Sequence, residues 1–127
     1  MGRLRTGGRA VRSQRGAAGS VLVAALCLIL VSAFMVAAVL IQWFFIARRA
    51  EQVAEISALA AVGASVRGDS PCPAAADAAG RNAASVVGCD VRGSGRSVVV
   101  DVVVRAPLEP QLGWGPSEVL RAATAGT

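Results

Sequence analysis

The sequence predicts a membrane-anchored α+β protein, in which a long N-terminal transmembrane helix continues outside the membrane and is followed by a short helix and a β-hairpin. Three observations support this fold class: an uncharged apolar run over residues 21–46, a helix-forming stretch directly after it, and a Val-rich alternating segment over residues 97–105. Beside such a helix, a chain of 127 residues has room for one small domain.

A basic tail, residues 1–19, precedes the apolar run. It contains Arg and no acidic residue, whereas from residue 20 onward Arg and acidic residues balance. We expect the tail to be disordered because it is polar and poor in large apolar side chains. It could bind the phosphates of nucleic acid, or it could be the cytoplasmic flank that orients a membrane helix. The apolar run favours the flank, so we expect no nucleic acid as a partner.

The apolar run predicts a transmembrane helix at residues 20–46, in contact with membrane lipid. About 20 apolar residues cross the hydrocarbon core, and a soluble helix apolar on every side could not be covered by so short a chain. A cleaved secretory signal is an alternative, but its apolar region normally has only about 7–15 residues. Bulky residues end the run, and Trp43 is expected to be an anchor at the outer interface.

The Arg residues on either side of the run predict its orientation. Five Arg precede it, and only Arg48 and Arg49 directly follow it. Because positive residues favour the cytoplasmic side, we expect a cytoplasmic N-terminus and an extracytoplasmic C-terminal domain. The predicted location is therefore the cell membrane, as a single-pass protein.

Residues 47–66 predict an extracytoplasmic extension of the helix. They are rich in helix-forming residues and contain no Pro. One face carries apolar or small side chains at helical spacing: Ile46, Ala50, Val53, Ile56 or Ser57, Ala60 and Ala64. This stripe could pack on the chain's own C-terminal domain or on other subunits, and the sequence leaves both open.

Residues 67–106 predict a small helix-hairpin domain. Residues 68–71 break the first helix, and the Ala-rich residues 73–82 predict a second one. Val at every even position of residues 97–105 indicates a half-buried strand. The Gly93-Ser94-Gly95 segment before it is typical of a hairpin turn that pairs this strand with another.

Cys72 and Cys89 are predicted to form a disulfide that staples this domain. If the second helix ends near Asn82, the following residues can return as a strand and bring Cys89 level with Cys72. An oxidising exterior favours the bridge; the alternative is two separate small apolar residues. Cys27, within the span, is expected to be an inert apolar residue.

Residues 107–127 predict an irregular C-terminal tail because Pro and Gly are frequent in its first half. Residues 117–123 could form one or two helical turns. Trp114 could cover the domain or enter the membrane surface, and the sequence does not decide between the two.

The composition argues against catalysis. The chain contains no His, no Tyr and no Lys, which leaves Asp and Glu as general bases. No catalytic pair, metal cluster or cofactor-binding motif is recognisable. We therefore predict that the chain is not an enzyme and binds no cofactor.

The junction Gly19-Ser20-Val21-Leu22-Val23 resembles a class III (type IV prepilin) leader, which is short, basic, ends in Gly and is removed at the cytoplasmic face. Two further features match: the Ala-rich residues 48–61, and the succession of Cys72, Asn82, Cys89, a Gly-rich turn and a Val-rich strand. The layout of residues 15–105 resembles the TadE-like pseudopilins of tight-adherence (type IVb pilus) systems, in the branch of high-GC Gram-positive bacteria.

The resemblance implies a non-catalytic minor pilin-like or pseudopilin-like subunit of a pilus or secretion apparatus, cut between Gly19 and Ser20. Implied partners are prepilin peptidase, other pilin-like subunits, and a pilus assembly platform with its ATPase. Gly16 is a second candidate junction. Many family members carry Glu at the fifth mature position, where this chain has Ala24. The alternative is an uncleaved single-pass anchor with an envelope structural or sensing role.

Overall fold

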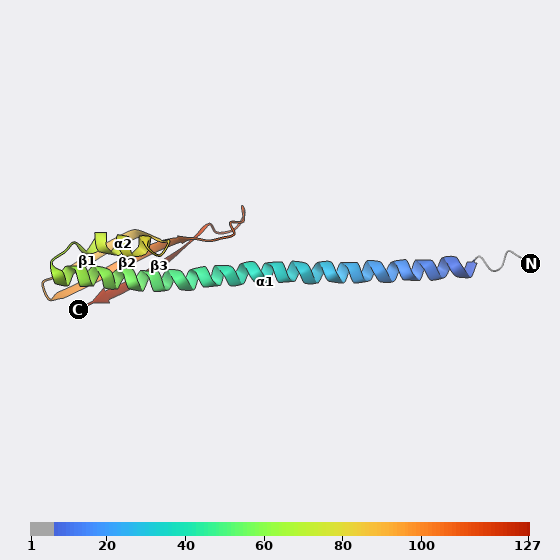
Figure 1. The fold of residues 1–127 in the computed structure, drawn as a ribbon, viewed down its shortest axis with the longest axis horizontal. Helices are drawn as coiled ribbons and strands as arrows, with labels where there is room; N and C mark the ends of the chain where they lie inside the picture. The colour runs from blue at the N-terminus through green and yellow to red at the C-terminus, as the bar shows by residue number, and fades with distance from the viewer. Residues whose placement is uncertain (1–6) are drawn as a thin grey trace, which may run out of the picture. The chain divides into compact units, whose positions relative to one another are not determined.

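The computed structural model describes the backbone of residues 7–127 and the side chains of residues 16–127. The chain forms two units, residues 1–39 and residues 40–127. The elements, shown in Figure 1, are α1 (Gly7–Arg67), α2 (Pro71–Gly80), β1 (Ser85–Ser94), β2 (Ser97–Pro107) and β3 (Glu118–Gly126).

Helix α1 begins at Gly7, earlier than the predicted start at Ser20. The tail predicted as disordered is therefore helical from residue 7 to residue 19, and residues 1–6 lie outside the described residues. Residues 7–19 contain no Pro, and extending an existing helix avoids the cost of nucleating a new one. The predicted span and its extension, residues 20–66, both lie within α1.

Helix α1 ends in a left-handed cap at Gly68, where φ is +84°. The amide of Asp69 donates to the carbonyl of Ala64 at 2.8 Å, and the amide of Gly68 donates to the carbonyl of Ser65 at 3.1 Å. This pair of bonds is the Schellman motif, which favours Gly because Gly adopts positive φ without steric cost. The predicted break at residues 68–71 is confirmed.

Helix α2 covers Pro71–Gly80, close to the predicted residues 73–82. Pro71 lies in its first turn, where a missing amide hydrogen removes no helical bond. After α2 the chain reverses through Ala83, whose φ is +57°, and the amide of Ala84 donates to the carbonyl of Ala79 at 3.1 Å. The residue in the left-handed conformation is thus an Ala, one position after the predicted Asn82.

The three strands form one antiparallel sheet in the order β1-β2-β3. Strands β1 and β2 form the predicted hairpin, and the pairing of Ser94 with Ser97 places the two-residue turn at Gly95-Arg96. Gly93 adopts a φ of +86°, and a Cβ at this position would collide with the carbonyl oxygen of Ser97. The backbone of this hairpin therefore requires Gly at residue 93.

The prediction for the C-terminal segment is wrong. Residues 107–127 are expected to be irregular, but Glu118–Gly126 forms β3 and pairs with β2 from Pro107↔Glu118 to Val99↔Gly126. The segment is rich in Ala, which has low intrinsic strand propensity, so its local pattern favours a helical turn. Pairing with the open edge of β2 overrides this local preference. Residues 108–117 form the loop between the two strands.

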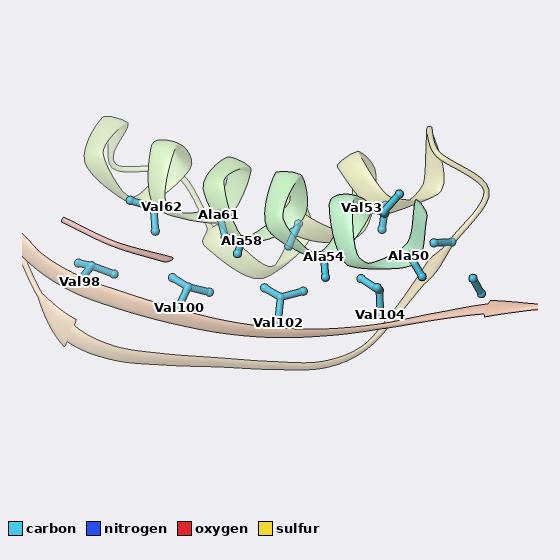
Figure 2. Close-up of a cluster of buried hydrophobic side chains, with 14 residues drawn as sticks. Ala50, Val53, Ala54, Ala58, Ala61, Val62, Val98, Val100, Val102 and Val104 are labelled. Carbon is cyan, nitrogen blue, oxygen red and sulfur yellow. The ribbon is translucent and has the colours of Figure 1, made fainter. Parts of the chain in front are cut away.

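The core of the domain lies between the sheet and the two helices (Figure 2). The even positions of β2 are buried, as the Val alternation predicts: Val98, Val100, Val102 and Val104. Opposite them lie small side chains of the two helices: Ala50, Val53, Ala54, Ala58, Ala61, Val62, Ala75 and Ala79. The apolar stripe of residues 47–66 therefore packs on the chain's own domain, whereas Ile56 remains exposed.

Candidate functional site

The first unit presents an apolar helix that the described residues leave uncovered. Every side chain of residues 16–38 is exposed, including Leu28 and Phe34, which are 69% and 77% exposed. Within the described part of the chain, one helix is long and apolar enough to cross a membrane, and its most apolar stretch is not buried. An exposed apolar surface of this extent is a site for lipid or for another apolar partner.

The predicted processing junction lies at the N-terminal end of this apolar surface. The hydroxyl of Ser20 donates to the carbonyl of Ala17 at 3.0 Å, so the junction is helical. An added Cβ at Gly16 or Gly19 would meet no described atom within 4 Å, so none of the described side chains covers either position. Each Gly destabilises a helix by about 1 kcal/mol relative to Ala, which weakens the helix over this stretch. Ala24 lies exposed one turn beyond Ser20.

Aromatic residues mark the other end of the apolar run, within the second unit. The indole N–H of Trp43 donates to the carbonyl of Pro110 at 3.2 Å and so ties α1 to the loop of residues 108–117. The guanidinium of Arg48 lies 5.3 Å from the centroid of the Phe44 ring, within cation–π range. An aromatic group followed by the first charges is the pattern of a membrane–water interface.

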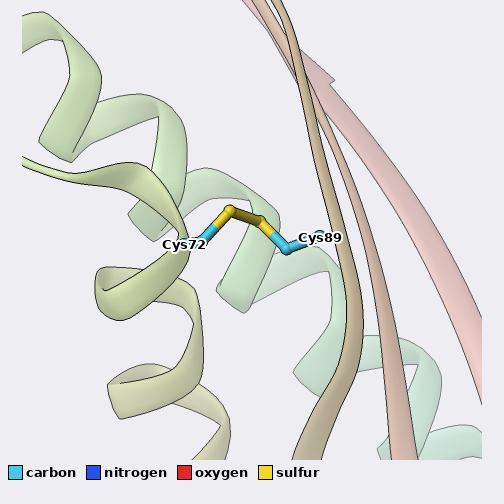
Figure 3. The surroundings of a disulfide bond; sticks show 2 residues. All are labelled: Cys72 and Cys89. Carbon is cyan, nitrogen blue, oxygen red and sulfur yellow. A yellow bond between two sulfur atoms is a disulfide. The ribbon is translucent and has the colours of Figure 1, made fainter.

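The structure confirms the predicted disulfide between Cys72 and Cys89 (Figure 3), with Cα atoms 5.9 Å apart. Cys72 lies in the first turn of α2, and Cys89 lies midway along β1 opposite Val102. The chain therefore reverses after α2 as the prediction requires, and the bridge fastens α2 to the sheet. Cys27 is free and exposed on the apolar helix.

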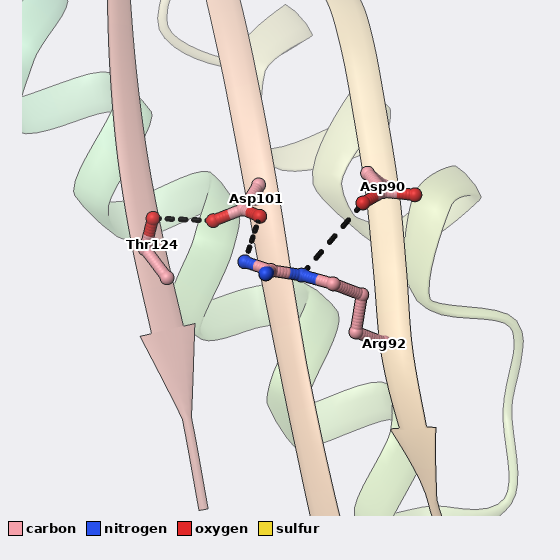
Figure 4. Close-up of polar contacts among 4 residues, drawn as sticks. All are labelled: Asp90, Arg92, Asp101 and Thr124. Atoms are coloured by element: carbon pink, nitrogen blue, oxygen red, sulfur yellow. Dashed lines mark hydrogen bonds and ion pairs between the residues drawn. The ribbon is translucent and has the colours of Figure 1, made fainter.

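A polar network on the outer face of the sheet was not predicted (Figure 4). The hydroxyl of Thr124 on β3 donates to the carboxylate of Asp101 on β2, and Arg92 on β1 pairs with that carboxylate and with Asp90. The Thr124 hydrogen bond, followed by Arg92, lowers the pKa of Asp101 below its ordinary value of 3.8, against partial desolvation that raises it. The network joins all three strands and helps to hold their register.

A cleft of about 320 Å³ lies within the second unit, between α1 and the turn that follows α2. Its lining is mainly apolar, with Ile46 on α1 and Ala83 in the turn, and Arg49 and Glu109 supply charged groups. Across residues 16–127, no group of three or more His, Cys, Asp or Glu is placed to hold a metal ion.

No family model, no curated protein and no solved structure matches this chain. Sequence reasoning found the apolar helix and the disulfide, but it missed the Asp101 network and the bond from Trp43 to Pro110. Asp101, at an odd position of the Val-rich strand, was a signal for a polar outer face. No sequence signal paired Trp43 with a loop 67 residues away.

Proposed function

We propose that the chain is a single-pass membrane protein and a non-catalytic pilin-like subunit of a tight-adherence or related secretion apparatus. The observation that carries the proposal is the bare apolar helix of residues 16–38, present in the same chain as a domain whose core is already filled. Such a helix is unfavourable in water, and lipid or the apolar helices of neighbouring subunits would cover it. Its N-terminus faces the cytoplasm, and residues 47–127 lie outside.

The pilin-like assignment adds a processing step at the cytoplasmic face. The uncovered Gly19 and Ser20 stand where the basic tail meets the apolar run, which is the position a leader peptidase at the inner membrane face would reach. Removing residues 1–19 would leave a free amine on an apolar helix that can move from lipid into an assembly. The energy would come from a platform and ATPase inside the cell.

The processing step is tested by the intact mass of the protein extracted from membranes in a strain that expresses prepilin peptidase. We expect the wild-type chain to begin at Ser20, and the Gly19→Phe variant to keep residues 1–19 because a bulky side chain blocks the cut. Gly16→Phe is the matched control, since its Cβ also meets no atom within 4 Å. It should be processed normally.

Two other measured masses would support other interpretations of the N-terminus. A start at Ala17 would move the junction to Gly16. A retained Met1 would exclude processing and support the second candidate function, an uncleaved anchor with an envelope structural or sensing role. Ala24 favours this second candidate, because a chain without Glu at the fifth mature position has no carboxylate to neutralise a neighbour's new amine.

The topology has its own test, with a membrane-impermeant maleimide added to intact cells. Arg96→Cys, in the exposed hairpin turn, should be labelled in intact cells. Arg5→Cys is placed in the Gly19→Phe variant, which keeps residues 1–19, and should be labelled only after lysis. Both variants also carry Cys27→Ala, because Cys27 is free. Cys72 and Cys89 do not interfere because they form a disulfide. The reverse labelling pattern would contradict the proposed orientation.

A further inference from the structure

We infer that residues 110–117 form a second contact with the membrane, in which Trp114 enters the interfacial region of the outer leaflet. The inference rests on the proposed span. It adds a lipid-binding site on the folded domain, far in sequence from the transmembrane helix.

The loop is held at the level of the last turn of the apolar run. Two of its residues contact the Trp43 side chain: the carbonyl of Pro110 accepts the indole hydrogen bond, and a Cβ on Gly115 would lie 3.1 Å from Cη2 of the ring. Trp43 precedes Ile46, the last residue of the run, by three positions, which is about 4.5 Å along a helix axis. The residues between these two contacts, 111–114, therefore lie near the depth at which the apolar run ends.

The chemistry of the loop suits lipid headgroups. Residues 110–117 carry no charge, and the nearest charged residue before them, Glu109, lines the same cleft as Arg49. Figure 1 shows the loop between β2 and β3 extending beyond the end of the sheet, with its tip rising away from α1. Backbone groups in such a loop can remain hydrated at the interface, which the hydrocarbon core would not allow.

Trp114 is the side chain that the domain leaves without cover. It is 87% exposed, more than any other large apolar residue described. Tryptophan prefers the membrane–water interface, where its ring is apolar and its N–H can bond to water or to a headgroup. One Trp on a short loop offers far less than the roughly 1,000 Å² that a specific protein–protein interface needs. Lipid is therefore the occupant that this surface fits.

The test uses the full-length protein in phosphatidylcholine–phosphatidylglycerol vesicles, with or without lipids brominated close to the headgroup. The chain contains two Trp, so the emission of Trp114 is the difference between the wild type and Trp114→Phe. This variant changes only an exposed side chain and keeps the bond from Trp43 to Pro110. We expect the difference signal to be blue-shifted and quenched by the brominated lipid.

Two results overturn the inference, and they have different meanings. If Trp43 in the Trp114→Phe protein is quenched by brominated lipid while the difference signal responds only to aqueous acrylamide, the span stands and the second contact is wrong. If brominated lipid quenches neither signal, the proposed membrane span fails as well.

Discussion

Small and branched apolar residues dominate both units of this protein, yet their environments are opposite. Val31, in the first unit, is 61% exposed, whereas Val102, in the second, is fully buried. The difference lies in arrangement rather than in composition. Apolar side chains occur on all sides of residues 21–39. On α1 beyond residue 50 and on β2, the buried apolar side chains lie on one face, and the other face is mostly polar with a few apolar side chains such as Leu59 and Val103. Periodicity thus distinguishes an apolar surface left exposed from a core that the chain covers itself.

The largest expected effect on this difference between the units comes from a charge placed in the protein core. Val102→Asp would bury an unpaired carboxylate, at a cost of about 3–5 kcal/mol, and should unfold the domain. Val103→Asp is the matched control, because that neighbouring side chain points to the outer face and is only half-buried. Circular dichroism melting in detergent micelles measures the effect. Equal stability of the two variants would contradict the assigned faces of β2.

The converse change places a charge in the apolar helix. Phe34→Asp, near the middle of the run, should weaken membrane insertion by about 3 kcal/mol and leave the melting of the domain unchanged. The measurement is the fraction of protein that resists carbonate extraction, with Phe34→Leu as the control. A domain that melts earlier in Phe34→Asp would mean that the two units depend on each other.

Removing the disulfide tests how much the bridge contributes to the stability of the second unit. The two cysteines are 17 residues apart, and closing a loop of this size stabilises a fold by about 3 kcal/mol. Cys89→Ala should lower the melting temperature of the domain, while Cys27→Ala, on the apolar helix, should leave it unchanged. A melting curve insensitive to both changes would show that the helices and sheet hold without the bridge.

The smallest expected effect is the pH dependence from Asp101. Its pKa is lower in the folded domain than the ordinary value of 3.8, so folding favours the ionised form. Its contribution is present above pH 3.8 and is lost as the pH falls below that value. The difference in melting temperature between wild type and Asp101→Asn should therefore shrink on acidification. Thr124→Ala removes the largest cause of the lowered pKa and should reduce this pH dependence.

Local signals account for the features that the sequence predicts correctly. Gly68 ends α1, the even-numbered Val residues set the buried face of β2, and the spacing of Cys72 and Cys89 around a short helix predicts their bridge. Each of these depends on residues close together in the chain. Their structure follows from capping, alternation and chain reversal, which a single sequence displays directly.

The features that the sequence does not predict depend on distant partners. Residues 118–126 form a strand because β2 offers an open edge, which their own Ala-rich pattern does not reveal. The loop of residues 108–117 is placed by Trp43, and the network of Asp101 needs three strands in register. The proposed processing at Gly19 is predicted still less directly, because it depends on an enzyme outside this chain.

Among the described glycines, Gly93 in the hairpin between β1 and β2 has the least room for a side chain. At Gly93 both the positive φ and the nearness of the Ser97 carbonyl exclude a side chain, whereas Gly16 and Gly19 have open space around them. In a library of random substitutions selected for a folded domain, residue 93 would stay glycine in nearly every survivor. The glycines at residues 16 and 19 would be replaced by many other residues, unless the library were also selected for cleavage.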